Sequence, residues 1–322
     1  MQITDNTRAF IESEVYSTFI LTNLHDGLLG EQFYRNVGDF SHGDTLNIKT
    51  IGSVTIQEAA ENTPLVYSPI ETGTITFRIT EYKGDAWYIT DDLREDGSQI
   101  DSLIAARAAE STRAIQEVFE TDFFKTALDY YVANPGANAV NGFNHLVVVP
   151  TPFKFTLAHM IGARLAFDKA NAPAEGRIFF CDPVVEATFN GLVTITSDVT
   201  PYSVDIVTNG IARGMRFVHK LYGWDIVLSN RLPVLAATLA GRSAVTGSTV
   251  STGQIGDVMN LFMCVADDQT KPIMGAWRRM PKSEGERNKD MARDEHVVRC
   301  RYGFGIQRVD TLLALVTSAT AY

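Results

Sequence analysis

The sequence predicts an α+β fold, on three observations. Residues 44–57 and 74–90 alternate apolar and polar side chains, as half-buried β-strands do. Residues 98–133 carry apolar side chains every three or four positions, which is typical of one long amphipathic helix. Strand-like segments return near the C-terminus, and helices and strands do not alternate strictly as they do in α/β proteins.

The size and composition of the chain are those of a globular protein. It has 322 residues, of which 45% are hydrophobic and 20% charged, enough for two lobes rather than one. The longest apolar runs, 232–240 and 312–316, are far shorter than the ~18 residues of a membrane span. Residues 1–15 lack the basic and apolar regions of a signal peptide. We therefore expect neither a membrane span nor a signal peptide.

The formal net charge of −10 disfavours non-specific DNA binding by the chain as a whole, because such binding depends on lysines and arginines that neutralise phosphates. Residues 278–301 are a local exception, with eight basic and five acidic side chains. The mixed signs predict a solvated, salt-bridged loop, and the alternative is a contact with a polyanion or a protein partner. Three widely spaced cysteines, Cys181, Cys264 and Cys300, lie in apolar segments and predict buried free thiols in a reducing compartment.

The segment that precedes the long helix is the most unusual part of the sequence. Residues 1–42 form an arm with partly helical spacing, and residues 43–90 form a two-stranded β-arm. Its tip, residues 58–73, holds three glutamates and two prolines and has little to fold against. An isolated ribbon is marginally stable and its open edges need cover, so we expect the arm to contact another copy of the chain. The candidate inter-subunit contacts are Glu58, Glu61, Pro64, Tyr67, Glu71, Lys49, Arg78 and Lys83.

The long helix is predicted to begin after Ser98, a candidate N-cap, and to end at residues 134–136. About 35 residues at ~1.5 Å per residue give a rod of roughly 50 Å, longer than most globular helices. The apolar side chains in phase along it are Ile100, Ile104, Ala108, Ile115, Phe119 and Phe123.

The remaining elements follow in order. A second helix is predicted over 156–169, with Leu157, Met160, Ile161, Arg164 and Leu165 in phase. A buried strand leading into a short helix follows at 176–190, and further strands at 204–208, 215–230 and 256–266. The Gly-, Ser- and Thr-rich residues 237–256 predict a flexible surface loop, and residues 295–319 predict closing strands.

Local catalytic motifs are missing from the sequence: it has no phosphate-binding GxxxxGK[ST] loop, HExxH, GxSxG or EF-hand loop. The glycines of "YGFGIQ" at 302–307 predict two tight packing points in a strand rather than a dinucleotide fingerprint. Asp294 and His296 would share one face of a strand, and the acidic residues at 90–96 precede the long helix. Structural roles explain both, so we expect no catalytic residue, metal or cofactor.

The order of these elements resembles that of the major capsid proteins of tailed bacteriophages with the Hong Kong 97-type fold. Residues 40–93 resemble that family's extended loop, and "GRIFFCDPVVEATF" at 176–189 resembles the strand that follows its helix pair. "LYGWDIVLSNRLP" at 221–233 and the closing strands at 296–316 resemble parts of its two lobes.

The resemblance implies an N-terminal arm at 1–42, an extended β-hairpin loop at 43–90, a peripheral domain with the spine helix at 91–170 and 271–322, and an axial domain at 171–270. It implies hexamers and pentamers that close into an icosahedral shell around double-stranded DNA, assembled in the host cytoplasm, without sequence-specific DNA binding. The expected partners are other copies of the chain, a separate scaffolding protein, a portal and a decoration protein.

Three alternatives stay open at this point. The first is an encapsulin-like shell with protein cargo, which the chain alone barely distinguishes. The second is a small-oligomer α+β enzyme whose site is assembled from scattered residues such as Asp294, His296 and the acids at 90–96. The third is a phage tail or connector component that forms rings or tubes.

Overall fold

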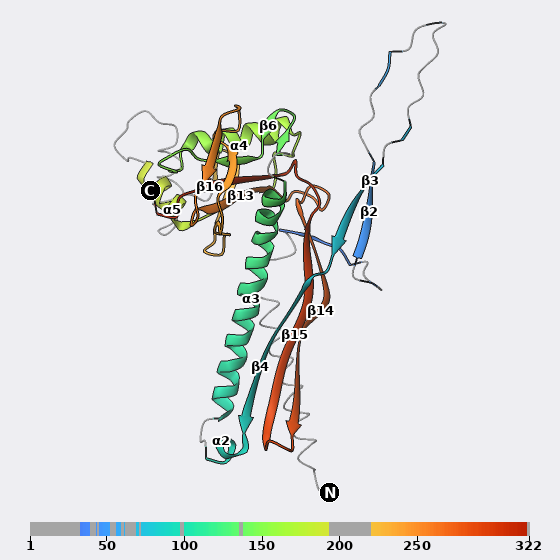
Figure 1. Ribbon diagram of the computed structural model, residues 1–322, viewed down its shortest axis with the longest axis vertical. Coiled ribbons are helices and arrows are strands. Elements are labelled where there is room, and N and C mark those ends of the chain that lie inside the picture. Colours follow the sequence, from blue (N-terminus) through green and yellow to red (C-terminus); the bar gives the residue numbers. More distant parts are fainter. Residues whose placement is uncertain are drawn as a thin grey trace.

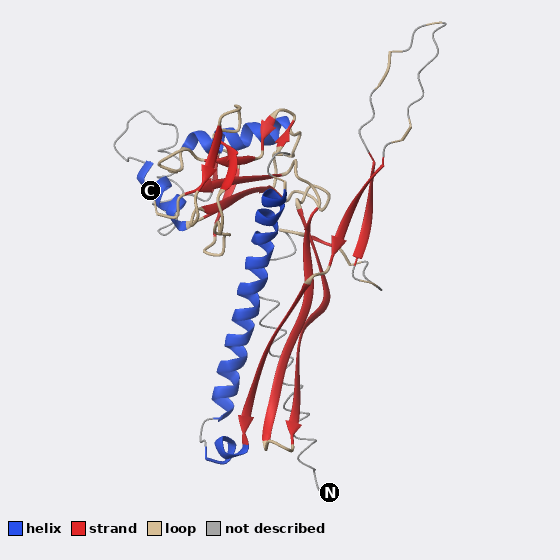
Figure 2. Cartoon of the chain, in the orientation of Figure 1, coloured by secondary structure: helices blue, strands red, loops and turns tan. Residues whose placement is uncertain are grey.

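The structure is a computed structural model that describes residues 33–38, 43, 45–51, 56–58, 61, 69–70, 72–96, 100–134, 138–192 and 220–320. A lobe built on a β-sheet lies at one end, and a long helix with three long strands extends from it as a leg (Figure 1). A two-stranded ribbon projects from the same end as the lobe (Figure 2). The mixture of helices and strands agrees with the predicted α+β class.

The elements have the following bounds. The described helices are α2 (Asp91–Asp96), α3 (Ile100–Ala133), α4 (Leu157–Lys169) and α5 (Pro183–Leu192). The described strands are β1 (Arg35–Asn36), β2 (Thr45–Ile51), β3 (Thr72–Arg78), β4 (Glu81–Thr90), β5 (Ala139–Val140), β6 (Phe143–Asn144), β7 (Leu146–Val148), β8 (Arg177–Cys181), β9 (Lys220–Leu221), β10 (Trp224–Leu228), β11 (Leu239–Arg242), β12 (Val250–Gly253), β13 (Val258–Cys264), β14 (Ile273–Asn288), β15 (Arg293–Ile306) and β16 (Leu312–Thr317).

Helix α3, the spine helix, confirms the long helix predicted from sequence. Its 34 residues correspond to about 51 Å at ~1.5 Å per residue. Ala108, Ile115, Phe119 and Phe123 of the predicted stripe are buried. They pack on β15 in one hydrophobic core, so the periodicity identified the face correctly. The proposed N-cap, Ser98, lies outside the described residues.

The leg is a four-stranded sheet in the order β1-β14-β15-β4 that packs along α3. The prediction that residues 74–90 pair throughout with 44–57 was wrong for the second half of that segment. Only β3 pairs with β2, whereas β4 pairs along β15 from Glu81 to Thr90. The alternation in β4 reflects the two faces of the leg sheet. The continuous alternating segment 74–90 is therefore divided between two sheets, with β3 in the ribbon and β4 in the leg.

Residues 278–301 form most of the β14–β15 hairpin, so the predicted loop was wrong. The register shifts between Trp277 and Lys282, where the buried Pro281 interrupts the ladder. Oppositely charged side chains, such as Arg279 and Glu284, form ion pairs along the hairpin. The segment is salt-bridged as expected, but on strands rather than in a loop.

The lobe contains an eight-stranded sheet in the order β12-β11-β7-β16-β13-β8-β10-β9. Helix α4 covers one face, where Met160, Ala163, Ala166 and Phe167 are buried. The predicted phase was right for Met160 and for Leu157, which packs against the same core, but wrong for Ile161 and Leu165, which are 49% and 40% exposed on the outer side of α4. The small alanines let the helix approach the sheet, a role that a pattern of large apolar residues does not identify.

Two further expectations concern the lobe. The predicted flexible loop at 237–256 was wrong, because it contains the antiparallel pair β11 and β12. Glycine is required there by close packing, since a Cβ on Gly241 would lie 2.7 Å from Cγ2 of Val148. The buried strand β8 followed by α5, and the fully buried strands β13 and β16, confirm the other predictions for this part of the chain.

The predicted domain limits can be compared with this topology. Strands β7 and β16, which were assigned to the peripheral domain, are hydrogen-bonded neighbours in the lobe sheet, and β16 pairs with β13 of the assigned axial domain. The division into peripheral and axial domains stays a prediction. Of the expected arm over 1–42, residues 33–38 are described and include β1, which pairs with β14. Residues 1–32 of the arm and the expected strand over 204–208 lie outside the described residues.

Candidate subunit-contact surface

The ribbon of β2 and β3 is anchored to the body of the protein through a small apolar core at its base. Phe77 and Ile79 are buried against Met274 and Ala276 of β14. The partly buried Leu46 and Ile48 of β2 pack against the same cluster. The apolar side chains of the two alternating segments therefore lie partly against their own chain, and only the part of the ribbon beyond this base is left to reach another molecule.

Four of the predicted contact residues on the ribbon are described and exposed, and three lie outside the described residues. Glu58 and Glu61 are exposed at the far part of the ribbon, and Ile56 nearby is 92% exposed. Lys49 is exposed, and its ammonium donates to Thr74 Oγ1 at 3.0 Å across the ribbon. The exposed Arg78 ends β3. Pro64, Tyr67 and Glu71 lie outside the described residues.

Lys83 differs from the others because it faces its own spine helix. Its Nζ lies 2.7 Å from Glu81 and 3.4 Å from Asp122 of α3. The Glu81 hydrogen bond and the nearby carboxylates raise the pKa of Lys83, and the same lysine lowers the pKa of Glu81. The ammonium is thus engaged within the subunit.

A second set of polar contacts fastens β4 to α3. Asp85 accepts two hydrogen bonds from Arg107 Nη2, at 2.9 and 2.8 Å, and one from Ser111 Oγ at 2.6 Å. Ser111 is buried between Ala108 and Ile115 on the core face of α3, and its hydrogen bond to Asp85 explains why a polar residue is stable there.

The opposite face of the leg sheet, here called the open sheet face, carries side chains that alternate with those facing α3. Val298, Cys300 and Tyr302 face the spine helix, so Arg299 and Arg301 face away from it. Lys282 of β14 pairs with Arg299 and shares this face. Within the described residues these three basic side chains form no ion pair, and Tyr82 beside Arg301 is 59% exposed.

Carboxylates and further basic groups gather at the far end of the leg. Asp294 forms ion pairs with Arg94 at 2.5 Å and with Arg287 at 3.5 Å. His296 stacks on Trp87, with ring centroids 4.3 Å apart. Asp294 and His296 therefore have separate structural partners, and the acids of 91–96 form helix α2. The structure brings Asp294 next to the 91–96 segment, where Asp91 and Asp294 share Arg287 as an ion-pair partner.

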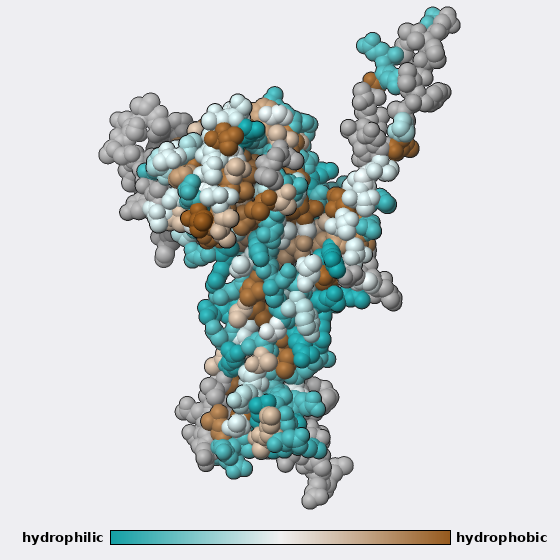
Figure 3. Space-filling view, viewed as in Figure 1, coloured by the Kyte–Doolittle hydropathy of each residue, from teal (hydrophilic) through white to brown (hydrophobic). Residues whose placement is uncertain are grey.

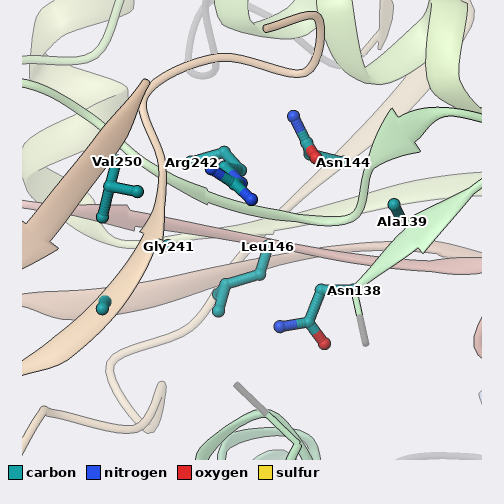
Figure 4. A pocket seen from close by; sticks show the side chains of 8 residues that line it. Asn138, Ala139, Asn144, Leu146, Gly241, Arg242 and Val250 are labelled. Atoms are coloured by element: carbon teal, nitrogen blue, oxygen red, sulfur yellow. The ribbon is translucent and has the colours of Figure 1, made fainter. Parts of the chain in front are cut away.

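A small pocket of about 160 Å³ lies between the β5–β6 and β11–β12 hairpins (Figure 4). Among the described residues that line it, Arg242 is the only ionisable one, and its Nη1 donates to the carbonyl of Ser248. The described part of the chain contains no cluster of three His, Cys, Asp or Glu side chains that could hold a metal ion. None of its helices is long and apolar enough to span a bilayer.

The open sheet face was not identified from sequence as a single surface. Its basic residues were noted, but as members of a loop, so their arrangement on one side of a sheet was missed. The signal that could have found it is the alternation at 297–303. There Arg299 and Arg301 alternate with Val298, Cys300 and Tyr302, which are buried.

Comparison with known proteins decides the family. The family model described as "Phage capsid protein" matches residues 71–316. The chain belongs to the phage capsid protein family. It is therefore a structural subunit of a phage capsid, and its place is in the multimeric shell of the virion. No curated protein matches the sequence significantly.

Solved structures confirm the predicted Hong Kong 97-type fold. A chain of the bacteriophage PhiM1 mature capsid is 15% identical, with a TM-score of 0.64 over 90% of this chain and 87% of that one. A chain of a native GTA particle capsid is 14% identical, with a TM-score of 0.59 over 90% and 89%. The SrpI encapsulin of Synechococcus elongatus is 11% identical, with a TM-score of 0.52 over 90% and 86%.

Proposed function

We propose that this capsid subunit assembles as hexamers and pentamers into a closed icosahedral shell that encloses double-stranded DNA. The single observation that carries the proposal is the family match over residues 71–316, which includes the spine helix, the leg sheet and the lobe. The similarity to capsid chains over nine-tenths of the length supports the same architecture.

The ribbon is proposed to reach a neighbouring subunit. Its exposed Glu58 and Glu61 carry negative charge, and Ile56 and Ile70 are 92% and 81% exposed. Covering such exposed apolar side chains by a partner lowers the free energy of the complex. A contact between copies buries these side chains in every subunit, because all subunits of a symmetric shell present the same surfaces.

The open sheet face is proposed as the receiving surface. Lys282, Arg299 and Arg301 offer positive charge without an ion-pair partner among the described residues, and Tyr82 adds an exposed ring. The side of the leg seen in Figure 3 is largely hydrophilic, and the basic side chains of the open sheet face suit a contact that depends on charge complementarity. Many such contacts, each modest, stabilise a shell together.

Double-stranded DNA is the proposed content. The net charge of −10 suits a container, because a strongly basic wall would hold the phosphates of the packaged DNA. A separate scaffolding protein, a portal and a decoration protein are proposed partners, with assembly in the host cytoplasm. The encapsulin likeness makes a protein-filled shell the second candidate.

Electron microscopy of the purified full-length chain, with and without a candidate scaffolding partner, tests the proposal. We expect closed, uniform icosahedral particles or their capsomers. Particles purified from infected cells should show the high ratio of absorbance at 260 to 280 nm that DNA gives. A protein-like ratio would favour the encapsulin function, and a small oligomer under both conditions would contradict both.

Deletion of residues 58–72 tests the role of the ribbon. The deleted segment lies beyond the apolar base of the ribbon, so we expect a soluble, folded subunit that does not close shells. Circular dichroism and thermal unfolding check the fold, and microscopy counts particles. Normal particles from this variant would rule out the ribbon tip as an assembly contact.

A further inference from the structure

The stretch Tyr302-Gly303-Phe304-Gly305 of β15 alternates the largest and the smallest side chains. Tyr302 and Phe304 face the spine helix, where both rings lie close to Phe119, with centroids 5.1 and 4.8 Å apart. Gly303 and Gly305 therefore face the opposite side of the sheet. The aromatic side belongs to the core of the leg, whereas the two glycines have no part in the contacts described so far.

The base of the ribbon lies on this glycine side. A Cβ on Gly303 would lie 2.8 Å from the carbonyl oxygen of Arg78 and 2.8 Å from Cα of Ile79. A Cβ on Gly305 would lie 2.9 Å from Cδ2 of Phe77. All three distances are shorter than van der Waals contact, so only glycine lets the ribbon pass this close to β15.

The path of the chain explains the close approach at Gly303. Strand β3 ends at Arg78 over the face of the sheet, while β4 begins at Glu81 on the edge of β15, opposite Tyr302. The two residues between these strands carry the backbone from the face to the edge. They cross β15 directly over Gly303, which is buried.

The cluster around this crossing fixes the ribbon on both sides. Met274 and Ala276 of β14 pair with Gly305 and Gly303, so their side chains share the same face. Phe77 and Ile79 fill the space above the glycines and are 1% and 3% exposed. The ribbon is thus seated in a close-packed socket rather than joined by a free linker.

We infer that Gly303 and Gly305 are positioning residues that set the direction in which the ribbon leaves the body, and that this direction decides whether the ribbon meets a neighbouring subunit. This inference rests on the proposed function. The ribbon acts as a lever, because a small rotation at its base becomes a displacement of several ångströms at its tip. Assembly then depends on a packing contact inside one subunit, at the base of the ribbon rather than at the tip that meets the neighbour.

The two glycines allow different tests. The Cβ of Gly303→Ala meets backbone atoms, so trimming a side chain cannot relieve it. The Cβ of Gly305→Ala meets the ring of Phe77, so Phe77→Leu should relieve it. Gly38→Ala is the matched control, because a Cβ there has no neighbour within 4 Å. No positive φ is recorded at these three glycines, so the alanines differ in steric contact alone.

The ribbon direction is measured on the unassembled full-length chain. Spin labels are attached at Thr74→Cys on β3 and Ala114→Cys on α3, both at exposed positions. The native cysteines are buried and do not take up label in the folded chain. Double electron–electron resonance gives the label separation, thermal unfolding gives the stability, and microscopy gives the yield of shells.

We expect Gly303→Ala to shift the label distance by several ångströms and to lower the shell yield at least tenfold, while the chain remains folded. Gly38→Ala should change neither readout. Phe77→Leu should restore both readouts in Gly305→Ala but not in Gly303→Ala. An unchanged label distance in Gly303→Ala, or normal shells with a shifted distance, would overturn the inference. Failure of the unsubstituted chain to form shells would instead overturn the proposed function, whatever the label distances.

Discussion

The phenol of Tyr302 on β15 donates a 2.7 Å hydrogen bond to Oδ2 of Asp122 on α3, and so joins the leg sheet to the spine helix across 180 residues of sequence. Burial and the Asp122 carboxylate raise the pKa of Tyr302, so its hydroxyl keeps the proton that it donates. Lys83 Nζ, 3.4 Å from the same carboxylate oxygen, adds a charge partner. The helix and the sheet are thus held by polar contacts as well as by the aromatic core.

Tyr302→Phe tests this contact. It removes the donor and leaves the Asp122 carboxylate with one partner fewer, so we expect the free energy of unfolding to fall by about 1–2 kcal/mol. Chemical denaturation measures the change. The control is Tyr82→Phe on the exposed face of β4, which should leave stability almost unchanged. Equal losses in both variants would show that the hydrogen bond does not stabilise the leg.

Helix α4 provides a test of which face is the core. Phe167 is fully buried and packs edge-on against Trp224, with centroids 4.9 Å apart. Phe167→Ala should therefore cost about 3–5 kcal/mol. Leu165→Ala, on the exposed side, should cost less than about 1 kcal/mol in the unassembled subunit. A larger loss of stability in Leu165→Ala than in Phe167→Ala would show that the face predicted from sequence is the core face.

His145 makes stability depend on pH. Its side chain is buried, Nδ1 lies 2.8 Å from the carbonyl of Leu312, and the ring stacks on Phe167. Burial lowers the pKa of His145, against the opposing effects of the Leu312 carbonyl and of Asp310. The unfolded chain therefore binds a proton at a higher pH than the folded one does.

The sign follows from this difference. Stability should be constant well above pH ~6.5, the ordinary pKa of histidine, and should fall as the pH drops from that value toward the lower folded pKa. Denaturation at pH 7.5, 6.5 and 5.5 measures the slope. His145→Gln should be less stable at pH 7.5 but should have a smaller slope below pH 6.5. An identical slope in both proteins would assign the acid sensitivity to other groups, such as His159, whose pKa burial also lowers.

Charge reversal tests the proposed contact between the ribbon and the open sheet face. Reversing the ribbon (Glu58→Lys with Glu61→Lys) or the sheet face (Lys282→Glu with Arg299→Glu) places like charges together, so each should lower the shell yield at least tenfold. A chain that carries all four substitutions should recover part of the yield. Glu175→Lys, an exposed reversal in the lobe, is the control. No recovery in the fourfold variant would show that these side chains do not meet.

Much of the fold could be predicted because local patterns determine it. The spine helix follows from Ala108, Ile115, Phe119 and Phe123 at helical spacing, and β8, β13 and β16 follow from continuous apolar runs. The two tight glycines of the 302–307 segment were also predicted correctly as packing points, since a Cβ on either would contact the ribbon.

The errors share a physical cause, which is that partner choice is not local. The alternation of β4 was correct, but nothing in it distinguishes β15 from β2 as its neighbour. In α4 the alanines that face the sheet carry less hydrophobic weight than Ile161 and Leu165, which do not. The open sheet face depends on the pairing of β14 with β15, so its basic residues could not be assigned to one surface before that pairing was known.

The central claim is that the chain builds a shell by reaching a neighbouring subunit with its ribbon. A cryo-electron microscopy reconstruction of assembled particles tests it most directly. The account predicts a closed shell in which Glu58 and Glu61 of one subunit lie within ion-pair distance of Lys282 or Arg299 on the next. Particles in which the ribbon folds back on its own subunit, or a preparation with small oligomers alone, would contradict it.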